Sequence, residues 1–322
     1  MPKTRTAIAI AVDVGGTYVK AGLVSKNGRV SRFEKHATYA WRGRDASLGA
    51  VVGAIKSLAV SAERLGRAVV GVGVGCPGPL DPKRGFIYNA VNLPGWVKLP
   101  LAKILQAETD LPVRVDNDAN LFTLGEWWTG AAKGAKSVIG VTLGTGIGGG
   151  IVIDGKIWHG ASGGAGEVGH VTVVADGIIC SCGKKGCVEA YSSASGLVLR
   201  TLRQMRRGVR TELNKWGDDF TVKNIVDAAR RGDVLAHVMT ADVPHYLGVV
   251  LGSLVNFFGP EVIVVGGGMA EIGDILFKPL RLAVKANCFP DAFKATRIVR
   301  AKLGIKGGVV GAGKMVWDAL AS

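Results

Sequence analysis

One short pattern occurs twice in this chain and constrains its fold more than any other feature. Each copy has an apolar strand segment, a loop of glycine and threonine, a second strand segment and an Asx-Gly turn. The first copy runs from residue 7 to Asn27-Gly28, and the second from residue 137 to Asp154-Gly155. Asx-Gly pairs are strongly favoured in hairpin turns. The repeat predicts a duplicated α/β fold with a cleft between its halves.

The rest of the sequence supplies strand and helix patterns in the order expected of an α/β protein. Further strands are predicted at residues 68–74, 113–115, 262–265 and 298–303. Helices are predicted at residues 46–65, 101–108, 119–128, 192–207, 221–231, 234–258 and 309–321. We expect an interruption of the long helix near Pro244. A length of 322 residues fits two domains, which we place at residues 1–118 with 303–322, and at residues 119–302.

Composition narrows the class of protein. Hydrophobic residues make up 48% of the chain and charged residues 20%, which excludes a disordered chain, a coiled coil and a collagen-like repeat. The net charge of +15 favours anionic partners such as nucleotides, polyphosphates, nucleic acid or acidic membrane surfaces. No uninterrupted apolar run reaches about 18 residues, and the basic segment 1–6 leads into a strand rather than a cleavage site. We therefore expect a cytoplasmic protein without a membrane partner.

Three cysteines and a histidine have the spacing of metal ligands. His170, Cys180, Cys182 and Cys187 form the pattern H-x9-C-x-C-x4-C, with glycines between the last ligands. Three thiolates and one imidazole make a closed tetrahedral zinc set, typical of structural sites. The alternative is three reduced cysteines without metal, but their polar and basic neighbours are unlike a protein core. With four protein ligands, the zinc ion would have no open coordination position, so it would hold the surrounding loop in place rather than activate water.

Two loops have the composition of phosphate-binding loops. In Asp13-Val-Gly-Gly-Thr17, a carboxylate at a strand end precedes backbone N–H groups and a hydroxyl. Such groups suit phosphate oxygens, and Asp13 could hold Mg²⁺ through water. The alternative is an ordinary tight hairpin. The second loop, Gly144-Thr-Gly-Ile-Gly-Gly-Gly150, contains a G-x-G-x-x-G pattern, but strand and hairpin follow it, which excludes the dinucleotide-binding fingerprint.

Two further groups of polar residues are candidates for binding and catalysis. Asp118 could act as a general base beside Asn117, although helix capping is the better explanation of the spacing alone. Glu167 lies three residues before His170, and Glu189 two residues after Cys187. Zinc binding would draw these three side chains together, where they suit a polyhydroxyl ligand. Alternatively, the two carboxylates only support the zinc.

Taken in order, these motifs resemble those of the ROK family (repressors, open reading frames and sugar kinases) of the actin-like ATPase superfamily. The resemblance covers essentially the whole chain. Its most specific part is Glu167-Val-Gly-His170 with the cysteine motif that follows, whereas the first glycine loop is shared across the superfamily. The resemblance implies two duplicated actin-like (ribonuclease H-like) α/β domains and a kinase that transfers the γ-phosphate of ATP to a hexose, usually to its 6-hydroxyl.

The resemblance also implies roles for individual residues. The family's catalytic aspartate matches Asp118. Its sugar contacts match Asn92, Asn117, Asp118, Glu167, His170 and Glu189. Its nucleotide, phosphate and Mg²⁺ contacts match Asp13, Gly15, Gly16, Thr17, Lys20, Gly144, Thr145, Gly146, Gly148, Gly149, Gly266, Gly267 and Gly268. ATP, Mg²⁺ and structural Zn²⁺ are the implied cofactors, and the implied assembly is a homodimer or a dimer of dimers.

The resemblance leaves several functions open. Glucose is the default substrate, and N-acetylhexosamines, mannose and fructose are alternatives. Inorganic polyphosphate could replace ATP as the donor, and a sugar sensor or repressor would have no turnover. A helix-turn-helix module needs tens of residues, whereas twelve precede Asp13 and one short helix closes the chain. We therefore expect no specific binding of nucleic acid.

Overall fold

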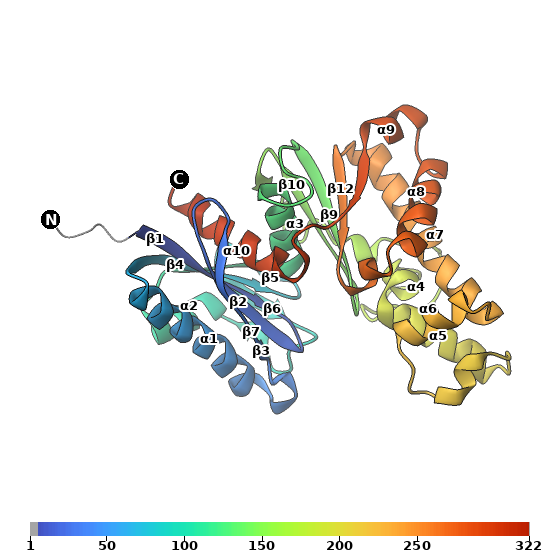
Figure 1. The fold of residues 1–322 in the computed structure, drawn as a ribbon, viewed down its shortest axis with the longest axis horizontal. Coiled ribbons are helices and arrows are strands. Elements are labelled where there is room, and N and C mark those ends of the chain that lie inside the picture. The colour runs from blue at the N-terminus through green and yellow to red at the C-terminus, as the bar shows by residue number, and fades with distance from the viewer. Residues whose placement is uncertain (1–5, 322) are drawn as a thin grey trace. The chain divides into compact units, whose positions relative to one another are not determined.

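The computed structural model describes residues 6–321 (Figure 1), so the basic segment 1–5 lies outside the described residues. The chain divides into two compact units. The first contains residues up to 136, residues 150–166 and residues from 302 onward. The second contains residues 137–149 and 167–301.

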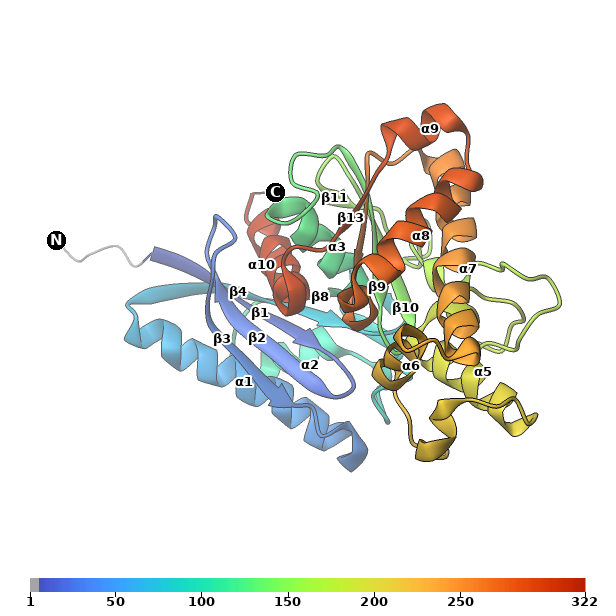
Figure 2. The same ribbon diagram turned by 45° about the vertical axis from the view of Figure 1, so that its right-hand side comes forward.

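A five-stranded sheet forms the centre of the first unit. Its strands are β1 (Thr6–Val14), β2 (Tyr18–Val24), β3 (Val30–Ala37), β4 (Arg67–Cys76) and β8 (Val113–Asn117), in the order β3-β2-β1-β4-β8. Strands β1, β4 and β8 are parallel. Helices α1 (Arg44–Arg64) and α10 (Gly307–Ala319) pack on opposite faces of the sheet, as Figures 1 and 2 show. Because both faces are covered, β1 is buried from Ile8 to Val12.

Smaller elements complete the first unit. A three-stranded sheet has the order β5-β6-β7. The remaining elements are β5 (Leu80–Asp81), β6 (Phe86–Asn89), β7 (Val97–Leu99), α2 (Leu101–Thr109) and α3 (Asp118–Trp128). Helix α3 packs closely along α10: a Cβ on Gly311 would lie 1.7 Å from the carbonyl oxygen of Leu121. Glycine is required there because any side chain would push the two helices apart.

A second five-stranded sheet has the order β11-β10-β9-β12-β13. Its strands are β9 (Ser137–Leu143), β10 (Ile147–Ile153), β11 (Lys156–Ile157), β12 (Val262–Gly266) and β13 (Arg297–Arg300). Helices of the second unit are α4 (Glu189–Ser192), α5 (Ala194–Arg206), α6 (Val222–Arg230), α7 (Val234–Phe258), α8 (Asp274–Ala286) and α9 (Pro290–Ala295). Figure 2 shows α7 and α8 side by side, and the two helices are in contact.

The repeat predicted from the sequence is confirmed. Asx-Gly turns join β2 to β3 and β10 to β11, and Gly28 and Gly155 have the positive φ angles of 81° and 78° that such turns need. The β1-β2 and β9-β10 connections are the two predicted glycine loops. Each sheet also has parallel strands next to its antiparallel strands, as expected of a duplicated α/β fold.

Two expected elements differ from the structure. Helix α7 is continuous through Pro244, so the predicted interruption is wrong; packing against α6 and α8 holds the helix although proline removes one of its hydrogen bonds. Strand β13 ends at Arg300 rather than at residue 303. The chain turns away there because the backbone N–H groups of Lys302 and Leu303 donate to the buried carboxylate of Glu126, at 3.0 and 2.7 Å.

The division into units also differs from the predicted domain boundaries. Residues 119–136 and 150–166 belong to the first unit, not the second. Helix α3 accounts for the first of these segments, because it packs against α10. A helix that follows a boundary in sequence can therefore belong to the unit before it.

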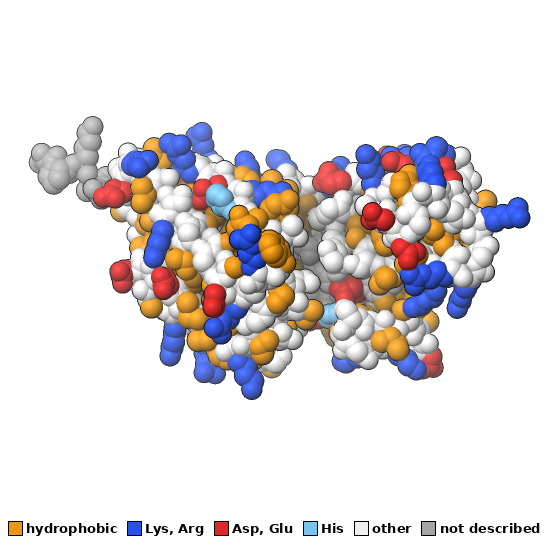
Figure 3. Space-filling model, turned by 90° about the horizontal axis from the view of Figure 1, so that it is seen from below, with side chains coloured by type: hydrophobic (Ala, Val, Ile, Leu, Met, Phe, Trp, Pro, Cys, Tyr) orange, Lys and Arg blue, Asp and Glu red, His pale blue; other side chains and the backbone are white. Residues whose placement is uncertain are grey.

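Two of the described helices, α1 and α7, are long and apolar enough to cross a membrane by length and composition. Helix α7 contacts α4, α5, α6 and α8, and α1 contacts β1, β2 and β4. Core helices of soluble proteins pass the same test, so this is weak support for a membrane span. On the face drawn in Figure 3, Lys and Arg side chains are dispersed rather than gathered in one patch. Cytoplasmic location and the absence of nucleic-acid and membrane partners stay predictions.

The contact between α3 and α10 gives the first testable prediction. Gly311→Ala should lower the free energy of unfolding by about 1–3 kcal/mol, because the new methyl group overlaps the backbone of α3. Gly49→Ala is the matched control, since Gly49 lies in α1 with nothing within 4 Å of its Cβ position. The control should be neutral or stabilising by up to about 1 kcal/mol. Chemical denaturation of both variants measures this, and equal stabilities would contradict the prediction.

Candidate functional site

Polar residues of the first unit meet where its parallel strands end. Asp13 is the last residue but one of β1 and pairs with Gly75 of β4; on the other side of β4, Cys76 pairs with Asn117 of β8. Asp118 follows as the first residue of α3. The carboxyl ends of parallel strands share one edge of a sheet, which is the usual place for a ligand in an α/β fold. A Cβ on Gly75 would lie 3.2 Å from Leu121 Cδ1 and 3.6 Å from the Cα of Asp118, so the start of α3 packs closely on β4.

Asp13 and the first glycine loop form one arrangement. Lys20 Nζ lies 2.8 Å from Asp13 Oδ2, and a Cβ on Gly308 near the start of α10 would lie 2.8 Å from Asp13 Cγ. The carboxylate thus lies beside a cation and the positive end of a helix. In the loop, Gly15 N donates to Tyr18 O, as in a tight hairpin.

Asn92 also lies against the first glycine loop. A Cβ on Gly16 would be 2.9 Å from the carbonyl oxygen of Asn92. The segment that carries Asn92 is anchored by Trp96, which is fully buried and donates through its indole N–H to Ser47 Oγ at 2.8 Å. The structure therefore brings this predicted sugar contact to the same edge as the loop.

Asn117 and Asp118 have different roles at the start of α3. Asn117 is the N-cap: its Oδ1 accepts from Ala119 N at 2.9 Å and from Asn120 N at 3.2 Å, so the capping interpretation is confirmed for this residue. Asp118 Oδ1 accepts from Ala119 N at 2.9 Å. Burial, and then the charge of Asp13, raise the pKa of Asp118 from 3.8 to about 6. This carboxyl group is thereby suited to proton transfer near neutral pH.

In the second unit, the four predicted metal ligands converge. The ligand atoms of His170, Cys180, Cys182 and Cys187 all lie within 4.8 Å of one another. Cys182 Sγ and Cys187 Sγ are 3.6 Å apart, and Cys180 Sγ is 3.8 Å from His170 Nδ1. Zinc–sulfur bonds of about 2.3 Å in a tetrahedron place neighbouring sulfur atoms about 3.8 Å apart. The donor set and its spacing therefore fit zinc.

Burial and neighbouring groups shift the pKa values of the clustered thiols in different directions. Burial, together with the neighbouring thiols, raises the pKa of Cys187 to about 12. A hydrogen bond from the backbone N–H of Lys184 is the main cause that lowers the pKa of Cys182. Gly183 and Gly186 have positive φ angles of 85° and 74°, which let the chain fold around the cluster.

Glu189 connects the cysteine cluster to the second glycine loop. Its Oε1 accepts from Ser181 Oγ at 3.0 Å, and its Oε2 accepts from Ile147 N at 2.8 Å. A Cβ on Gly146 would lie 2.5 Å from Oε2, so the loop closes directly over this carboxylate. His170 ends a short 3-10 helix, Val168–His170, whose N-cap Glu167 is exposed.

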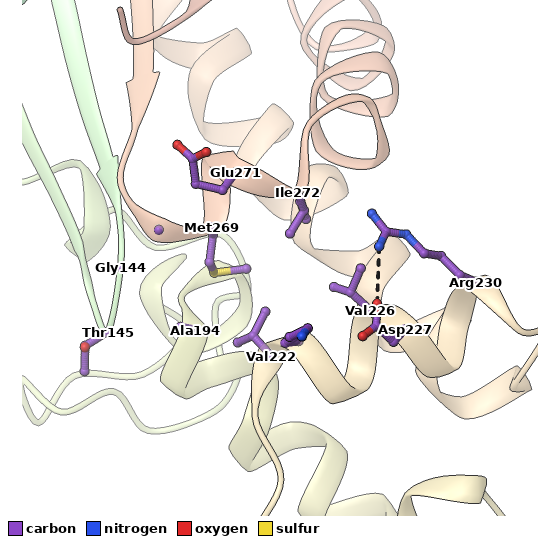
Figure 4. A pocket seen from close by; sticks show the side chains of 12 residues that line it. Gly144, Thr145, Ala194, Val222, Val226, Asp227, Arg230, Met269, Glu271 and Ile272 are labelled. Atoms are coloured by element: carbon purple, nitrogen blue, oxygen red, sulfur yellow. Dashed lines mark hydrogen bonds and ion pairs between the residues drawn. The ribbon is translucent and has the colours of Figure 1, made fainter. Parts of the chain in front are cut away.

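A cavity of about 570 Å³ opens beside the second glycine loop (Figure 4). Gly144 and Thr145 border it on one side and Gly268 on another, because Thr142 and Gly266 are paired at the ends of β9 and β12. A Cβ on Gly267 would lie 2.3 Å from Leu143 O, so only glycine allows these two loops to touch. Gly148 and Gly149 were predicted as loop residues, but they lie in strand β10.

Comparison with known proteins identifies the relatives of this arrangement. The ROK family model matches residues 9–319. The chain is 38% identical to the glucokinase of Halalkalibacterium halodurans, over 95% of this chain and 94% of that protein. The chain belongs to the ROK family.

Solved ROK structures have the same fold. The ROK hexokinase from Thermus thermophilus matches with a TM-score of 0.85 and 30% identity, over 98% of this chain and 99% of that one. A ROK glucokinase from Streptomyces griseus, solved in complex with glucose and AMPPNP, matches with a TM-score of 0.81 and 34% identity, over 97% of this chain and 99% of that one. The fold of this ROK protein is thus the two-domain actin-like fold that the sequence predicted.

The structure adds residues that the sequence analysis missed. Figure 4 shows apolar side chains of α6 and of the 3-10 helix Gly268–Ile272 around the cavity, with an ion pair between Asp227 and Arg230 at its border. The added lining residues are Ala194, Val222, Lys223, Val226, Asp227, Arg230, Met269, Glu271 and Ile272. The glycine loops mark only one side of this cavity. The other side comes from a helix whose sequence shows an ordinary amphipathic pattern.

The cysteine cluster gives the second prediction. Cys182→Ser should lose about one equivalent of zinc per chain, because a hydroxyl is a much poorer zinc ligand than a thiolate. Cys288→Ser is the matched control, since Cys288 lies outside the cluster, and it should keep its zinc. Mass spectrometry of the purified variants measures the zinc content per chain. A metal-free wild-type protein that is correctly folded would contradict the zinc assignment.

Proposed function

We propose that this ROK protein is an ATP-dependent hexokinase that phosphorylates the 6-hydroxyl of a hexose, with glucose as the first candidate and Asp118 as the general base. It is a sugar kinase by its family and its relatives. The observation that carries the finer proposal is the carboxyl group of Asp118, placed beside Asp13 at the sheet edge with its pKa raised to about 6.

On the acceptor side, we assign the sugar contacts to the side chains that the family motifs match. Asn117 and Asp118 are adjacent at the β8–α3 corner, and Asn92 lies beside the first glycine loop. In the second unit, Glu167, His170 and Glu189 flank the cysteine cluster. Carboxylates, amides and an imidazole are well suited to the several hydroxyl groups of a hexose.

On the donor side, we assign the 570 Å³ cavity to the adenosine part of ATP. Its apolar side chains, among them Val222, Val226 and Met269, suit a flat base. The phosphates would meet the N–H groups of the two glycine loops, with Lys20 as a further cationic contact. This support is independent of the sugar residues, and it fits the AMPPNP bound in the Streptomyces griseus relative.

The chemical step follows from these positions. The sugar hydroxyl loses its proton to Asp118 as its oxygen bonds to the γ-phosphorus, and the bond from phosphorus to the bridging oxygen breaks to release ADP. Exclusion of water is needed so that the hydroxyl competes successfully for the phosphoryl group. The protein therefore contributes mainly positioning and charge stabilisation.

Two metals have separate places in this proposal. Mg²⁺ would neutralise phosphate charge, and Asp13 is the carboxylate we assign to it, directly or through water. Zinc at the cysteine cluster would hold the segment that leads into Glu189 at the start of α4 and fix the ring of His170. Because four protein ligands close the zinc set, the residues around it bind and orient the sugar rather than activate water.

The experiment that tests the function is a coupled assay of ADP release with Mg-ATP. The panel contains glucose, mannose, fructose, N-acetylglucosamine and N-acetylmannosamine. Parallel reactions use polyphosphate as the donor and are followed through formation of the sugar phosphate, because they release no ADP. ADP release that depends on one hexose would support the proposal and name the substrate. Activity with polyphosphate alone would show that polyphosphate, not ATP, is the phosphoryl donor. No activity with any sugar or donor, from a folded and zinc-containing protein, would favour a non-catalytic sensor or repressor.

The third prediction concerns the proposed base. Asp118→Asn should lower kcat by about 10²–10⁴-fold, because an amide cannot accept the hydroxyl proton. Glucose binding measured by calorimetry should stay within a few fold of wild type. Asp45→Asn is the control, since this side chain of α1 is 89% exposed and should leave kcat unchanged. Near-normal turnover of Asp118→Asn would exclude Asp118 as the base.

The fourth prediction concerns pH. Asp118 must be ionised to accept a proton, and its pKa is raised to about 6, so kcat/KM should fall about tenfold per pH unit below pH 6. A carboxyl group with the ordinary value of 3.8 would keep the enzyme active down to about pH 4. The measurement is kcat/KM for the preferred hexose from pH 4.5 to 8. A flat profile between pH 5 and 7 would contradict the assignment.

A further inference from the structure

A half-buried histidine pairs with a buried carboxylate directly behind the proposed catalytic corner. His159 Nε2 is 2.7 Å from Asp116 Oδ2, and the Asp116 side chain is 4% exposed. Both residues belong to the first unit. Asp116 immediately precedes Asn117 and Asp118, whereas His159 lies 43 residues further along the chain.

The other oxygen of Asp116 holds the corner itself. Asp116 Oδ1 accepts from the backbone N–H of Asn117 at 2.7 Å and from Asn120 Nδ2 at 3.0 Å. Asn120 is buried in the first turn of α3. One carboxylate therefore connects the last residue of β8 to the start of α3, the two elements that place Asn117 and Asp118.

His159 supplies the remaining partner of this carboxylate. It follows β11 in the segment 150–166, and its carbonyl accepts from Ala165 N at 3.1 Å. The segment packs on α3: a Cβ on Gly150 would lie 2.6 Å from Thr123 Oγ1. Without the histidine, Asp116 Oδ2 would be buried and unpaired, which is costly for a carboxylate.

We propose that His159 and Asp116 form a positioning pair that fixes the β8–α3 corner, and with it the sugar-facing orientation of Asn117 and Asp118. The role of the pair in catalysis rests on the proposed hexokinase function. Neither residue is a proton donor or acceptor for the substrate in this scheme. Their effect reaches the sugar only through the backbone of Asn117 and the first turn of α3.

The pair can be tested without any enzyme assay. The pKa of His159 is raised mainly by its hydrogen bond to Asp116, against the lowering effects of burial and of nearby Lys83. NMR titration of the five histidines, with His159 assigned from the His159→Gln variant, should show this raised pKa in wild type. Asp116→Asn should lower it, because the negative partner is lost. An unchanged pKa in Asp116→Asn would overturn the pair.

Positioning is tested by hydrogen exchange followed by mass spectrometry. In His159→Ala, peptides covering residues 116–121 should exchange faster than in wild type, since Asp116 is then free to release the Asn117 N–H. His159→Gln, which offers an N–H donor at a similar reach, should restore most of the protection. His36→Ala is the matched control, because His36 pairs with Glu34 on exposed β3 at the opposite edge of the sheet. Equal exchange in all variants would overturn the positioning role.

Kinetics then tests the catalytic consequence, which is the fifth prediction. His159→Ala should lower kcat/KM for the hexose by about 10–100-fold, with KM for the hexose raised and KM for ATP unchanged. A general loss of folded enzyme would instead lower kcat alone. His159→Gln should recover most of the activity, and His36→Ala should match wild type.

The two proposals fail in different ways. An inactive wild-type protein would refute the hexokinase function while exchange and titration still decide the pair. An active wild type with unaffected His159→Ala kinetics would refute the positioning role alone.

Discussion

Parallel pairing of β1, β4 and β8 is the constraint on which the first unit depends. Parallel strands end at a common edge, so the residues that follow each strand meet although they are far apart in sequence. Asp13, Cys76 and Asn117 come together in this way. The second unit repeats the arrangement with β9, β12 and β13, whose ends bring the loops after Leu143 and Gly266 into contact. Each unit thus builds its own polar edge from the same topology.

Glycine residues allow neighbouring backbone segments to approach one another closely in both units. At Gly267 the backbone of one loop touches another, and at Gly311 two helices approach to a distance that excludes a side chain. At Gly146 the loop closes over Glu189, whose other oxygen is held by Ser181 beside the cysteine cluster. The high glycine content, 48 of 322 residues, therefore has specific positions to explain it. Zinc binding at the cluster would in turn stabilise the segment that leads into Glu189.

Three carboxylates of the first unit, those of Glu126, Asp116 and Asp118, differ in their surroundings. Glu126 accepts from the backbone of residues 302 and 303 and ends the second sheet's last strand early. Asp116 holds the corner before α3, and Asp118 has the raised pKa that a base requires. Glu126 and Asp116 each accept several hydrogen bonds, whereas burial, and then the negative charge of Asp13, raise the pKa of Asp118.

The sequence by itself determined the repeat, both glycine loops, most helices and strands, and the four residues of the proposed zinc site, because these depend on local periodicity, turn residues and ligand spacing. It also offered capping and a general base as alternatives for Asn117 and Asp118, and the structure assigned the cap to Asn117. Only the tertiary structure decided that α3 belongs with α10, that Pro244 lies within a continuous helix, and that α6 borders the cavity. It also paired Asp116 with His159, 43 residues apart. Such long-range contacts follow from how elements pack, and no local pattern in the sequence records them.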